Sequence, residues 1–482
     1  MSTYSSILPL VTPRWLLEVT DARRVRRALE EIEPALGRSG SSIKKCKVKL
    51  RVLGADGRWM GSVPIEVEEP GGAGAVREVL LAARFSPPDR RADGDRAVAR
   101  GRFGEPGWRC RIPELGLELA TRADEDDPPG RSLLMDPDRV RGLLQESIRG
   151  ARTAWRGVVV SSCQPEETRR KLASRSTVRY RLGYEPGSPG AGPDQPPAVV
   201  VAKAYRPGTG SGTFSAMSAL WTSALRRSAT VRIAEPIAYH PEIDVLVQGP
   251  VPEEATLKEL IGDILTAPDP TALGRLGALL ERTATGLAEL HRCGVNTGPR
   301  RGWEEELGEV EGRLRALGAV IPQVEGLGRE LVDRAGAILG PPPPGGEVPS
   351  HGGFRAAQVL VAGHDIGFID FDSFCMADPA MDLAEFVRFL VQEGFGEPDC
   401  LDGAEARARL SLLDDLSDAV LDSYRATAQV DPQRVVAWQA LGWLNRLLAG
   451  WAKAKTDRLA IDAHLMDHFL ARWGLPGAPF AL

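Results

Sequence analysis

The sequence predicts an α+β protein with more than one domain, in which strand-forming segments come first and helices dominate the second half. The chain has 482 residues, which is more than one hydrophobic core usually serves. Apolar and polar residues alternate in several segments before residue 250, whereas leucines at helical spacing recur after residue 270. This division predicts three domains, at 1–130, 131–252 and 253–482.

The composition is that of a water-soluble globular protein. Hydrophobic residues make up 43% and charged residues 26%, and the formal net charge is -5, which argues against binding to nucleic acid or to anionic membranes through overall charge. No apolar run is long enough to cross a bilayer, and the N-terminus lacks a signal-peptide pattern. The six cysteines are widely spaced, so we expect a reduced, cytoplasmic protein without a zinc site.

The first 130 residues predict a small α+β accessory domain. Its expected elements are a helix at 21–36 and strands at 45–52, 62–67, 77–85 and 108–112, followed by a solvated linker at 124–130. In the first strand Lys45, Lys47, Lys49 and Arg51 share one face. That face could hold an acidic ligand, but we favour the interpretation that it keeps a strand edge soluble.

The rest of the chain predicts a strand-rich region and then a helical one. A helix at 136–148 precedes strands at 157–161, 176–183, 198–205, 236–240 and 244–248, with a further helix at 212–227. Helices dominate from residue 271, where leucines recur at helical spacing. We interpret His291, at the end of this leucine-rich segment, as a packed residue and not as a catalytic one.

Three separated blocks between residues 351 and 384 carry the functional argument. They read His351-Gly-Gly-Phe-Arg-Ala-Ala-Gln358, then Ile366-Gly-Phe-Ile-Asp370-Phe-Asp372, then Asp378-Pro-Ala-Met-Asp382-Leu-Ala. In residue type, order and spacing they resemble the catalytic signature of the aminoglycoside phosphotransferase and choline kinase superfamily. The resemblance extends from about residue 155 to about residue 450 and implies a two-lobed, kinase-like fold that binds ATP and Mg²⁺.

The resemblance also implies roles for individual residues. Asp370 would be the main Mg²⁺ ligand, and Gln358 would take the place of the loop asparagine that is the second ligand. His351 would brace the catalytic loop, and Asp382 would hold it through hydrogen bonds. Phosphoryl transfer depends chiefly on such positioning and on neutralising the charge of the phosphates.

The departure from the family pattern is Gly353, where the family has an aspartate that orients and deprotonates the acceptor hydroxyl. General-base assistance contributes roughly 10²–10⁴ in rate, so weak transfer could persist without it. Asp372 or an acid from a partner could substitute. Arg355, on the same loop, could contact a phosphate or bridge to a surface carboxylate.

The resemblance places the nucleotide against the strand-rich region. Lys203 resembles the strand lysine that contacts the α- and β-phosphates, although residues 207–228 contain no Asp or Glu to pair with it. Ser174, Ser176 and Thr177 lie where the superfamily folds a loop over the phosphates, or form an ordinary polar turn. Gln248 falls in the expected hinge between the lobes, where adenine would bind.

Two functions remain open at this point. The first is an ATP-dependent phosphotransferase that acts on a hydroxyl of a small molecule or of a peptide Ser or Thr. The second is a pseudokinase, a binding or scaffolding partner of another enzyme, for example in peptide natural-product biosynthesis.

Overall fold

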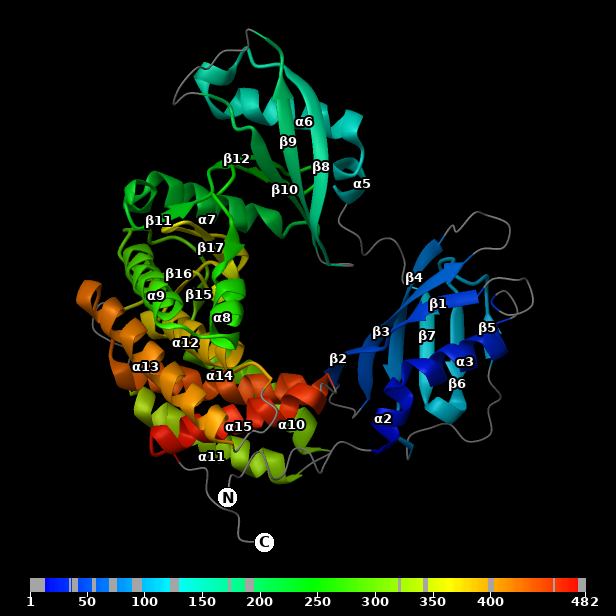
Figure 1. Cartoon of the computed structure of the whole chain (residues 1–482). Coiled ribbons are helices and arrows are strands. Elements are labelled where there is room, and N and C mark those ends of the chain that lie inside the picture. Colours follow the sequence, from blue (N-terminus) through cyan, green and yellow to red (C-terminus); the bar gives the residue numbers. More distant parts are fainter. Residues whose placement is uncertain are drawn as a thin grey trace. The chain divides into compact units, whose positions relative to one another are not determined.

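In the computed structural model of this protein, the chain forms two compact units (Figure 1). Unit 1 comprises residues 1–124, 303–338 and 440–482, and unit 2 comprises residues 125–302 and 339–439. The residues that the structure describes are 14–33, 36, 42–53, 58–68, 76–88, 98–121, 130–171, 175–186, 195–319, 322–340, 346–397, 403–453 and 456–475. Among these residues, no helix is both long and apolar enough to cross a membrane.

Unit 1 is built on a seven-stranded antiparallel sheet with the order β1-β3-β4-β7-β6-β5, in which β2 also pairs with β3. The strands are β1 (Ser42–Cys46), β2 (Lys49–Leu53), β3 (Trp59–Glu68), β4 (Val76–Phe85), β5 (Val98–Arg100), β6 (Arg109–Ile112) and β7 (Leu117–Thr121). The helices are α2 (Arg14–Thr20), α3 (Ala22–Ile32), α10 (Trp303–Gly318), α11 (Pro322–Leu339), α14 (Pro432–Ala452) and α15 (Thr456–Arg472), of which α11 and α14 continue into unit 2. The helix expected from residue 21 is α3, and Asp21 caps it by accepting a hydrogen bond from the backbone N–H of Arg23.

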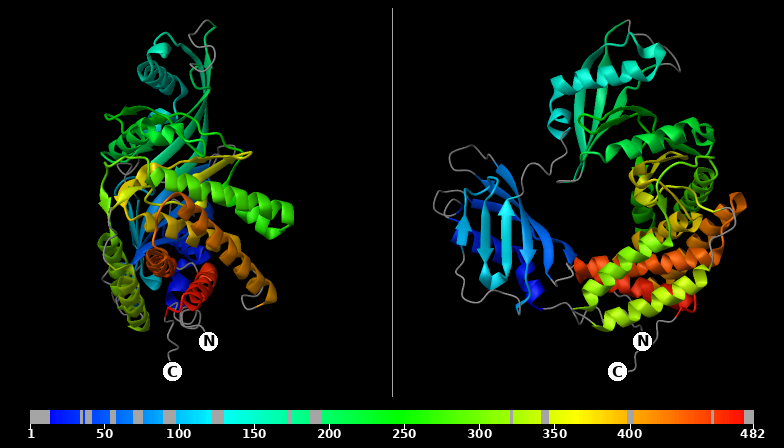
Figure 2. Two further views of the ribbon diagram at one scale, coloured as in Figure 1. Left: turned by 90° about the vertical axis from the view of Figure 1, so that its left-hand side faces the viewer. Right: turned by 180° about the vertical axis from the view of Figure 1, so that it is seen from behind.

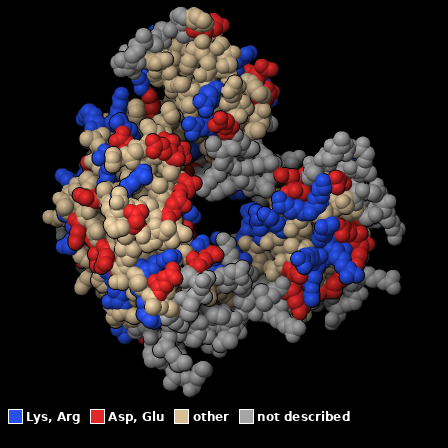
Figure 3. Space-filling view, in the orientation of Figure 1, with Lys and Arg blue, Asp and Glu red and all other residues tan. Residues whose placement is uncertain are grey.

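The strand expected at 45–52 is divided in the structure. Its first part is β1, its second part is β2, and the two pair with different parts of β3. Lys44 and Lys45 form ion pairs with Glu68 and Glu66 of β3, at 2.8 and 2.7 Å. Basic and acidic side chains accordingly lie together on this sheet in Figure 3. The predicted linker lies outside the described residues except for Gly130.

The first part of unit 2 is a five-stranded antiparallel sheet with the order β12-β13-β10-β9-β8. Its strands are β8 (Val160–Lys171), β9 (Arg175–Tyr184), β10 (Val199–Tyr205), β12 (Pro236–His240) and β13 (Val245–Gln248). The helices of this lobe are α5 (Arg131–Leu134), α6 (Pro137–Ala151), which Asp136 caps, and α7 (Gly210–Thr222). Helix α6 packs its apolar face on the sheet through Val140, Leu144 and Ile148, all fully buried.

The second part of unit 2 is mainly helical (Figure 2). Its helices are α8 (Leu257–Thr266), α9 (Pro270–His291), α12 (Pro379–Phe395) and α13 (Ala404–Thr427). Two small sheets carry the loops of the site, with the orders β11-β18-β17-β14 and β15-β19-β16. Their strands are β11 (Val231–Ile233), β14 (Ala255–Thr256), β15 (Arg300–Arg301), β16 (Val348–Ser350), β17 (Val359–Ala362), β18 (Asp365–Phe368) and β19 (Cys375–Ala377).

Helix α12 starts at a buried polar junction. Asp378 is its N-cap and accepts a hydrogen bond from the Ala380 N–H at 2.9 Å. The same carboxylate accepts from Arg434 Nε at 2.8 Å and from Trp438 Nε1 at 3.2 Å. The start of α12 is thereby fixed.

Unit 2 as a whole consists of an antiparallel sheet followed by helices. This order of elements confirms the predicted α+β, kinase-like fold.

Candidate functional site

A cavity of about 630 Å³ in unit 2 is bounded by both lobes of that unit. The side that belongs to the sheet contributes Thr177, Arg179, Val201, Lys203 and Gln248. The helical side contributes Thr256, Lys258, Glu259, Arg355, Gln358, Asp370, Phe389 and Glu393, among others. Six of the residues selected from the sequence therefore line one cavity, namely Thr177, Lys203, Gln248, Arg355, Gln358 and Asp370.

Lys203 lies within β10 and is 7% exposed. Its Nζ is 3.3 Å from Asp370 Oδ1 and 3.5 Å from Asp372 Oδ1. The Tyr205 hydroxyl donates a hydrogen bond to Asp372 Oδ1 at 2.8 Å. The helix after Lys203 supplies no acidic partner. Two aspartates about 170 residues further along the chain take this place. From the sequence we had expected both aspartates to have other roles.

Asp370 adopts an unusual backbone conformation. Its φ of 73° and ψ of 49° lie in the left-handed region, which costs a residue other than glycine about 1–3 kcal/mol. Asp370 lies two residues after the end of β18 and precedes the short turn Phe371–Ser373. Such strain is typical of functional sites, because the surrounding structure must hold the side chain in place.

The loop from His351 to Gln358 is anchored at its start by Asp382. This carboxylate accepts hydrogen bonds from the backbone N–H groups of His351 (2.5 Å) and Gly352 (2.9 Å). Burial alone would raise the pKa of Asp382, but hydrogen bonds from the His291 side chain and from the His351 backbone N–H lower it. Asp382 therefore holds the loop as a carboxylate, as the resemblance implied.

His351 connects the same loop to the end of β18. Its Nε2 donates a hydrogen bond to the carbonyl oxygen of Ile369 at 2.9 Å, one residue before Asp370. Its Nδ1 is buried, with no hydrogen-bond partner among the described residues. Burial lowers the pKa of His351, so the imidazole stays neutral. This geometry suits bracing and not proton transfer.

The middle of the loop combines a packed side chain with an open position. Phe354 is fully buried, with its ring centroid 4.7 Å from that of Phe368 and 5.3 Å from that of Phe386. At Gly353, by contrast, an added Cβ would meet no described atom within 4 Å. No described carboxylate therefore lies within 4 Å of the position that a Cβ would take at residue 353.

The structure does not bring every predicted residue to the cavity. Ser176 is 2% exposed within β9 and does not line the cavity, although its neighbour Thr177 does. Ser174 lies outside the described residues. Alternation along a strand explains the difference between Ser176 and Thr177, because successive side chains point to opposite faces.

Gln248 and Gln358 present amide groups to the cavity. Gln248 is 5% exposed, and its Oε1 has no hydrogen-bond partner in the described part of the chain. A buried acceptor without a partner costs free energy, which a ligand with an N–H donor would recover. Gln358 Oε1 is 3.4 Å from Arg355 Nε.

Oxygen ligands suitable for Mg²⁺ are present, but the protein alone does not form a closed metal site. Among the described residues, no group of three or more His, Cys, Asp or Glu side chains is arranged to hold a metal ion. Asp370 and Gln358 both line the cavity and both offer oxygen atoms. Because Mg²⁺ is usually held by one or two carboxylates together with phosphate and water, these residues fit that ion.

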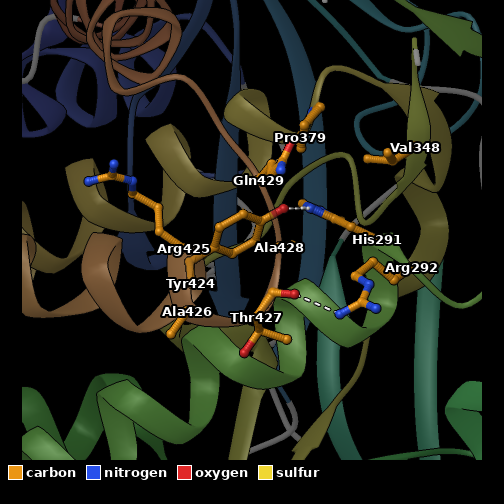
Figure 4. A pocket seen from close by; sticks show the side chains of 10 residues that line it. All are labelled: His291, Arg292, Val348, Pro379, Tyr424, Arg425, Ala426, Thr427, Ala428 and Gln429. Atoms are coloured by element: carbon orange, nitrogen blue, oxygen red, sulfur yellow. Dashed lines mark hydrogen bonds between the residues drawn. The ribbon is translucent and has the colours of Figure 1, made fainter. Parts of the chain in front are cut away.

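A second pocket, of about 320 Å³, lies near His291 (Figure 4). Nδ1 of His291 is 2.7 Å from the Tyr424 hydroxyl, and its Nε2 is 3.3 Å from Asp382 Oδ2. Arg292 donates a hydrogen bond to the carbonyl oxygen of Thr427 at 2.6 Å. His291 is 3% exposed, so it is the packed histidine that the sequence predicted, and it supports Asp382.

Residues 221–425 match the family model described as the phosphotransferase enzyme family. No match was found among curated protein sequences.

Solved structures similar to this chain include three kinases. They are a choline/ethanolamine kinase family protein from Mesorhizobium loti (15% identity, TM-score 0.39, covering 70% of this chain and 95% of the other) and a choline kinase from Cryptosporidium parvum (12%, 0.44, 69% and 97%). The third is a thermostable mutant of an aminoglycoside phosphotransferase in complex with ADP and hygromycin B (12%, 0.42, 69% and 98%). The three sequence blocks lie within the segment that matches the phosphotransferase family model, which confirms the resemblance drawn from them.

Proposed function

We propose that this protein, whose residues 221–425 match the model of the phosphotransferase enzyme family, binds ATP with Mg²⁺ in the cavity of unit 2 and transfers the γ-phosphoryl group to a small-molecule or peptide acceptor. One observation carries the proposal. Lys203, from the sheet, reaches Asp370 on the helical side at 3.3 Å inside a cavity that both lobes line. A buried lysine beside a metal-binding carboxylate supplies the charge that polyphosphate binding requires.

Other residues support the same arrangement. Lys203 would contact the phosphates, and Thr177 would add a hydroxyl donor from the neighbouring strand. The unpartnered Oε1 of Gln248 fits an acceptor for the exocyclic amine of adenine. Asp370 and Gln358 would hold Mg²⁺, which neutralises phosphate charge when bound.

A second function is favoured by one specific observation, the open space at Gly353. A protein that binds nucleotide but lacks the usual base could act as a pseudokinase that presents a substrate to a partner enzyme. Nucleotide binding is common to both functions, so it is the property to test first.

The test is calorimetric titration of ATP, with and without Mg²⁺, into the full chain and into an Asp370→Asn variant. We expect Mg²⁺-dependent binding that the substitution weakens by roughly tenfold or more, equivalent to about 1.4 kcal/mol. Asp365→Asn serves as the control, because this aspartate begins β18, the strand that leads to Asp370, and 54% of its side chain is exposed. Absence of ATP binding to the unsubstituted protein would overturn the proposal. Binding without turnover of any acceptor would favour the pseudokinase.

A further inference from the structure

Arg355 differs from the other basic side chains that line the cavity. Each of the other three has an acidic partner: Lys203 has Asp370, Lys258 has Glu393 at 3.1 Å, and Arg179 has Glu253 at 3.6 Å. Within the described part of the chain, Arg355 forms no ion pair, and its only hydrogen bond is the long contact with Gln358. A half-buried guanidinium without a carboxylate partner favours the binding of an anion from outside the chain.

The position of Arg355 is held by packing. Its guanidinium lies 5.2 Å from the ring centroid of Phe389, and Arg388 lies 4.2 Å from the same centroid. Stacking on an aromatic ring keeps a planar guanidinium in place while its donors stay available. The neighbouring α12 therefore presents Arg355 to the cavity, and both Arg355 and Phe389 line it.

Two further arginines lie close to this part of the loop. Arg301 donates a hydrogen bond to the carbonyl oxygen of Gly352 at 2.6 Å, and Arg388 is 7% exposed. Arg301, Arg355 and Arg388 all lie within electrostatic reach of Glu385, one turn after Asp382 on α12, and Asp382 acts on the same carboxyl group. Among the described residues Glu385 forms no ion pair with Arg355, so it leaves the donors of this guanidinium available.

Chemistry links Arg355 to its neighbour Gly353. A hydroxyl acceptor must lose a proton during transfer, and the side chain that would take it is missing. A carboxylate or a phosphate monoester needs no such help, because these groups are already ionised near neutral pH, with pKa values of about 4 and 6. The aspartate that is absent at 353 would serve a neutral acceptor, whereas Arg355 would serve an anionic one.

We infer that the acceptor oxygen is already anionic when it binds, as a carboxylate or phosphate monoester oxygen, and that Arg355 holds it over the open space at Gly353. This inference rests on the proposed function. The acceptor oxygen forms a bond to the γ-phosphorus, and the bond between that phosphorus and the β,γ-bridging oxygen breaks. The bonding electrons leave with ADP, and no proton is removed from the acceptor. The product is an acyl phosphate or a diphosphate.

The experiment measures ADP release by the full chain with Mg²⁺, ATP and three acceptor classes: dicarboxylates such as succinate, phosphate monoesters such as glycerol 3-phosphate, and uncharged polyols such as glycerol. Hydroxylamine trapping reports an acyl phosphate, and phosphorus NMR reports a diphosphate, so the two anionic sources are distinguished. We expect turnover with an anionic class and at least roughly tenfold less with polyols. Turnover of polyols alone would overturn the inference.

Substitutions of the loop sharpen the test. We expect Arg355→Gln to lower kcat/KM for the anionic acceptor by roughly 10- to 100-fold and Arg355→Lys to lower it less, with ATP affinity within about twofold of the unsubstituted value. Gly353→Asp should lower turnover of the anionic acceptor through like-charge repulsion. Arg232→Gln is the matched control, because that side chain is 62% exposed. An unchanged kcat/KM in Arg355→Gln, or a gain with anionic acceptors in Gly353→Asp, would contradict the inference.

A binding measurement covers the case in which none of the tested acceptors is turned over. Succinate and glycerol 3-phosphate are titrated into the complex with Mg²⁺ and ADP, and binding that Arg355→Gln abolishes supports the inference. Binding of neither anion overturns it. If the chain does not bind ATP at all, the proposed function fails first, and the calorimetric titration with ATP identifies that case separately.

Discussion

Two adjacent glycines of the catalytic loop are glycine for different physical reasons. Gly352 has a φ of +77°, and a Cβ added there would lie 1.9 Å from the carbonyl oxygen of Ser373. At Gly353 the backbone is outside the left-handed region, and no described atom would lie within 4 Å of an added Cβ. The backbone therefore requires glycine at 352. At 353 a side chain would be accommodated, so the absence of the aspartate changes the chemistry of the site and is not imposed by the backbone.

Alanine at these two positions should give clearly different stabilities. We expect Gly352→Ala to lower the free energy of unfolding by about 1–3 kcal/mol or more, because it adds backbone strain and a clash. Gly353→Ala should change it by less than about 1 kcal/mol. Urea unfolding followed by circular dichroism measures both. Similar losses for the two variants would show that Gly353 also has a packing role.

The motif blocks and the strand order account for the presence of Asp370, Gln358 and Lys203 in one cavity. The metal- and phosphate-binding roles of these residues stay predictions. The pairing of Lys203 with Asp372 was not predictable, because it depends on a backbone turn at Asp370 that no pattern indicates. The sequence also did not predict that Arg355 lacks an ion pair among the described residues, because this depends on the positions of carboxylates in other elements.

At the scale of elements, the catalytic loop is a short segment fixed by side chains from other elements. Asp382 of α12 holds its start, and His351 ties it to the end of β18. The buried His351 is neutral, because burial lowers its pKa below the ordinary value of about 6.5. Protonation of His351 is therefore coupled to the stability of this part of unit 2.

This coupling gives a pH dependence with a definite sign. As pH falls below about 6.5, the unfolded chain takes up a proton at His351 that the folded protein does not, so stability falls by up to about 1.4 kcal/mol per pH unit until the folded pKa is reached. We expect the slope of unfolding free energy between pH 6.5 and 5 to be smaller in His351→Gln, which retains an N–H donor but does not titrate. His364→Gln, at an exposed position, is the control. An unchanged slope in His351→Gln would contradict this account.

Helices and strands were predicted best where the periodic pattern of apolar residues extends over the whole element. The helices α6 and α9 and the strands β4, β10 and β12 were expected within a few residues of their bounds. The division of the expected strand at 45–52 was missed, because a register change is set by the partner strand β3 and not by the local alternation.

At the scale of the whole molecule, unit 1 is assembled from three separated segments of the chain. A cluster of tryptophans joins two of them: the ring centroid of Trp59, on β3, lies 5.5 Å from those of both Trp15 and Trp451. Trp59 is 1% exposed and Trp451 is 2% exposed. Sequence patterns describe local periodicity, so they did not group the N-terminal sheet with helix α14, almost 400 residues away. We propose that the N-terminal region is not an independent accessory domain.

This arrangement predicts that a change near the C-terminus weakens the N-terminal sheet. Trp451→Ala removes a buried aromatic ring, which typically costs about 3–5 kcal/mol, so hydrogen exchange should become faster in β3 and β4. Trp473→Ala, where the side chain is 38% exposed within the same unit, should leave exchange in these strands unchanged. Peptides from β9 and β10 in unit 2 report whether the effect is local. Faster exchange in β3 with unchanged exchange in β10 would support a cooperative unit 1, whereas unchanged protection of β3 would mean that the sheet folds independently of the C-terminal helices.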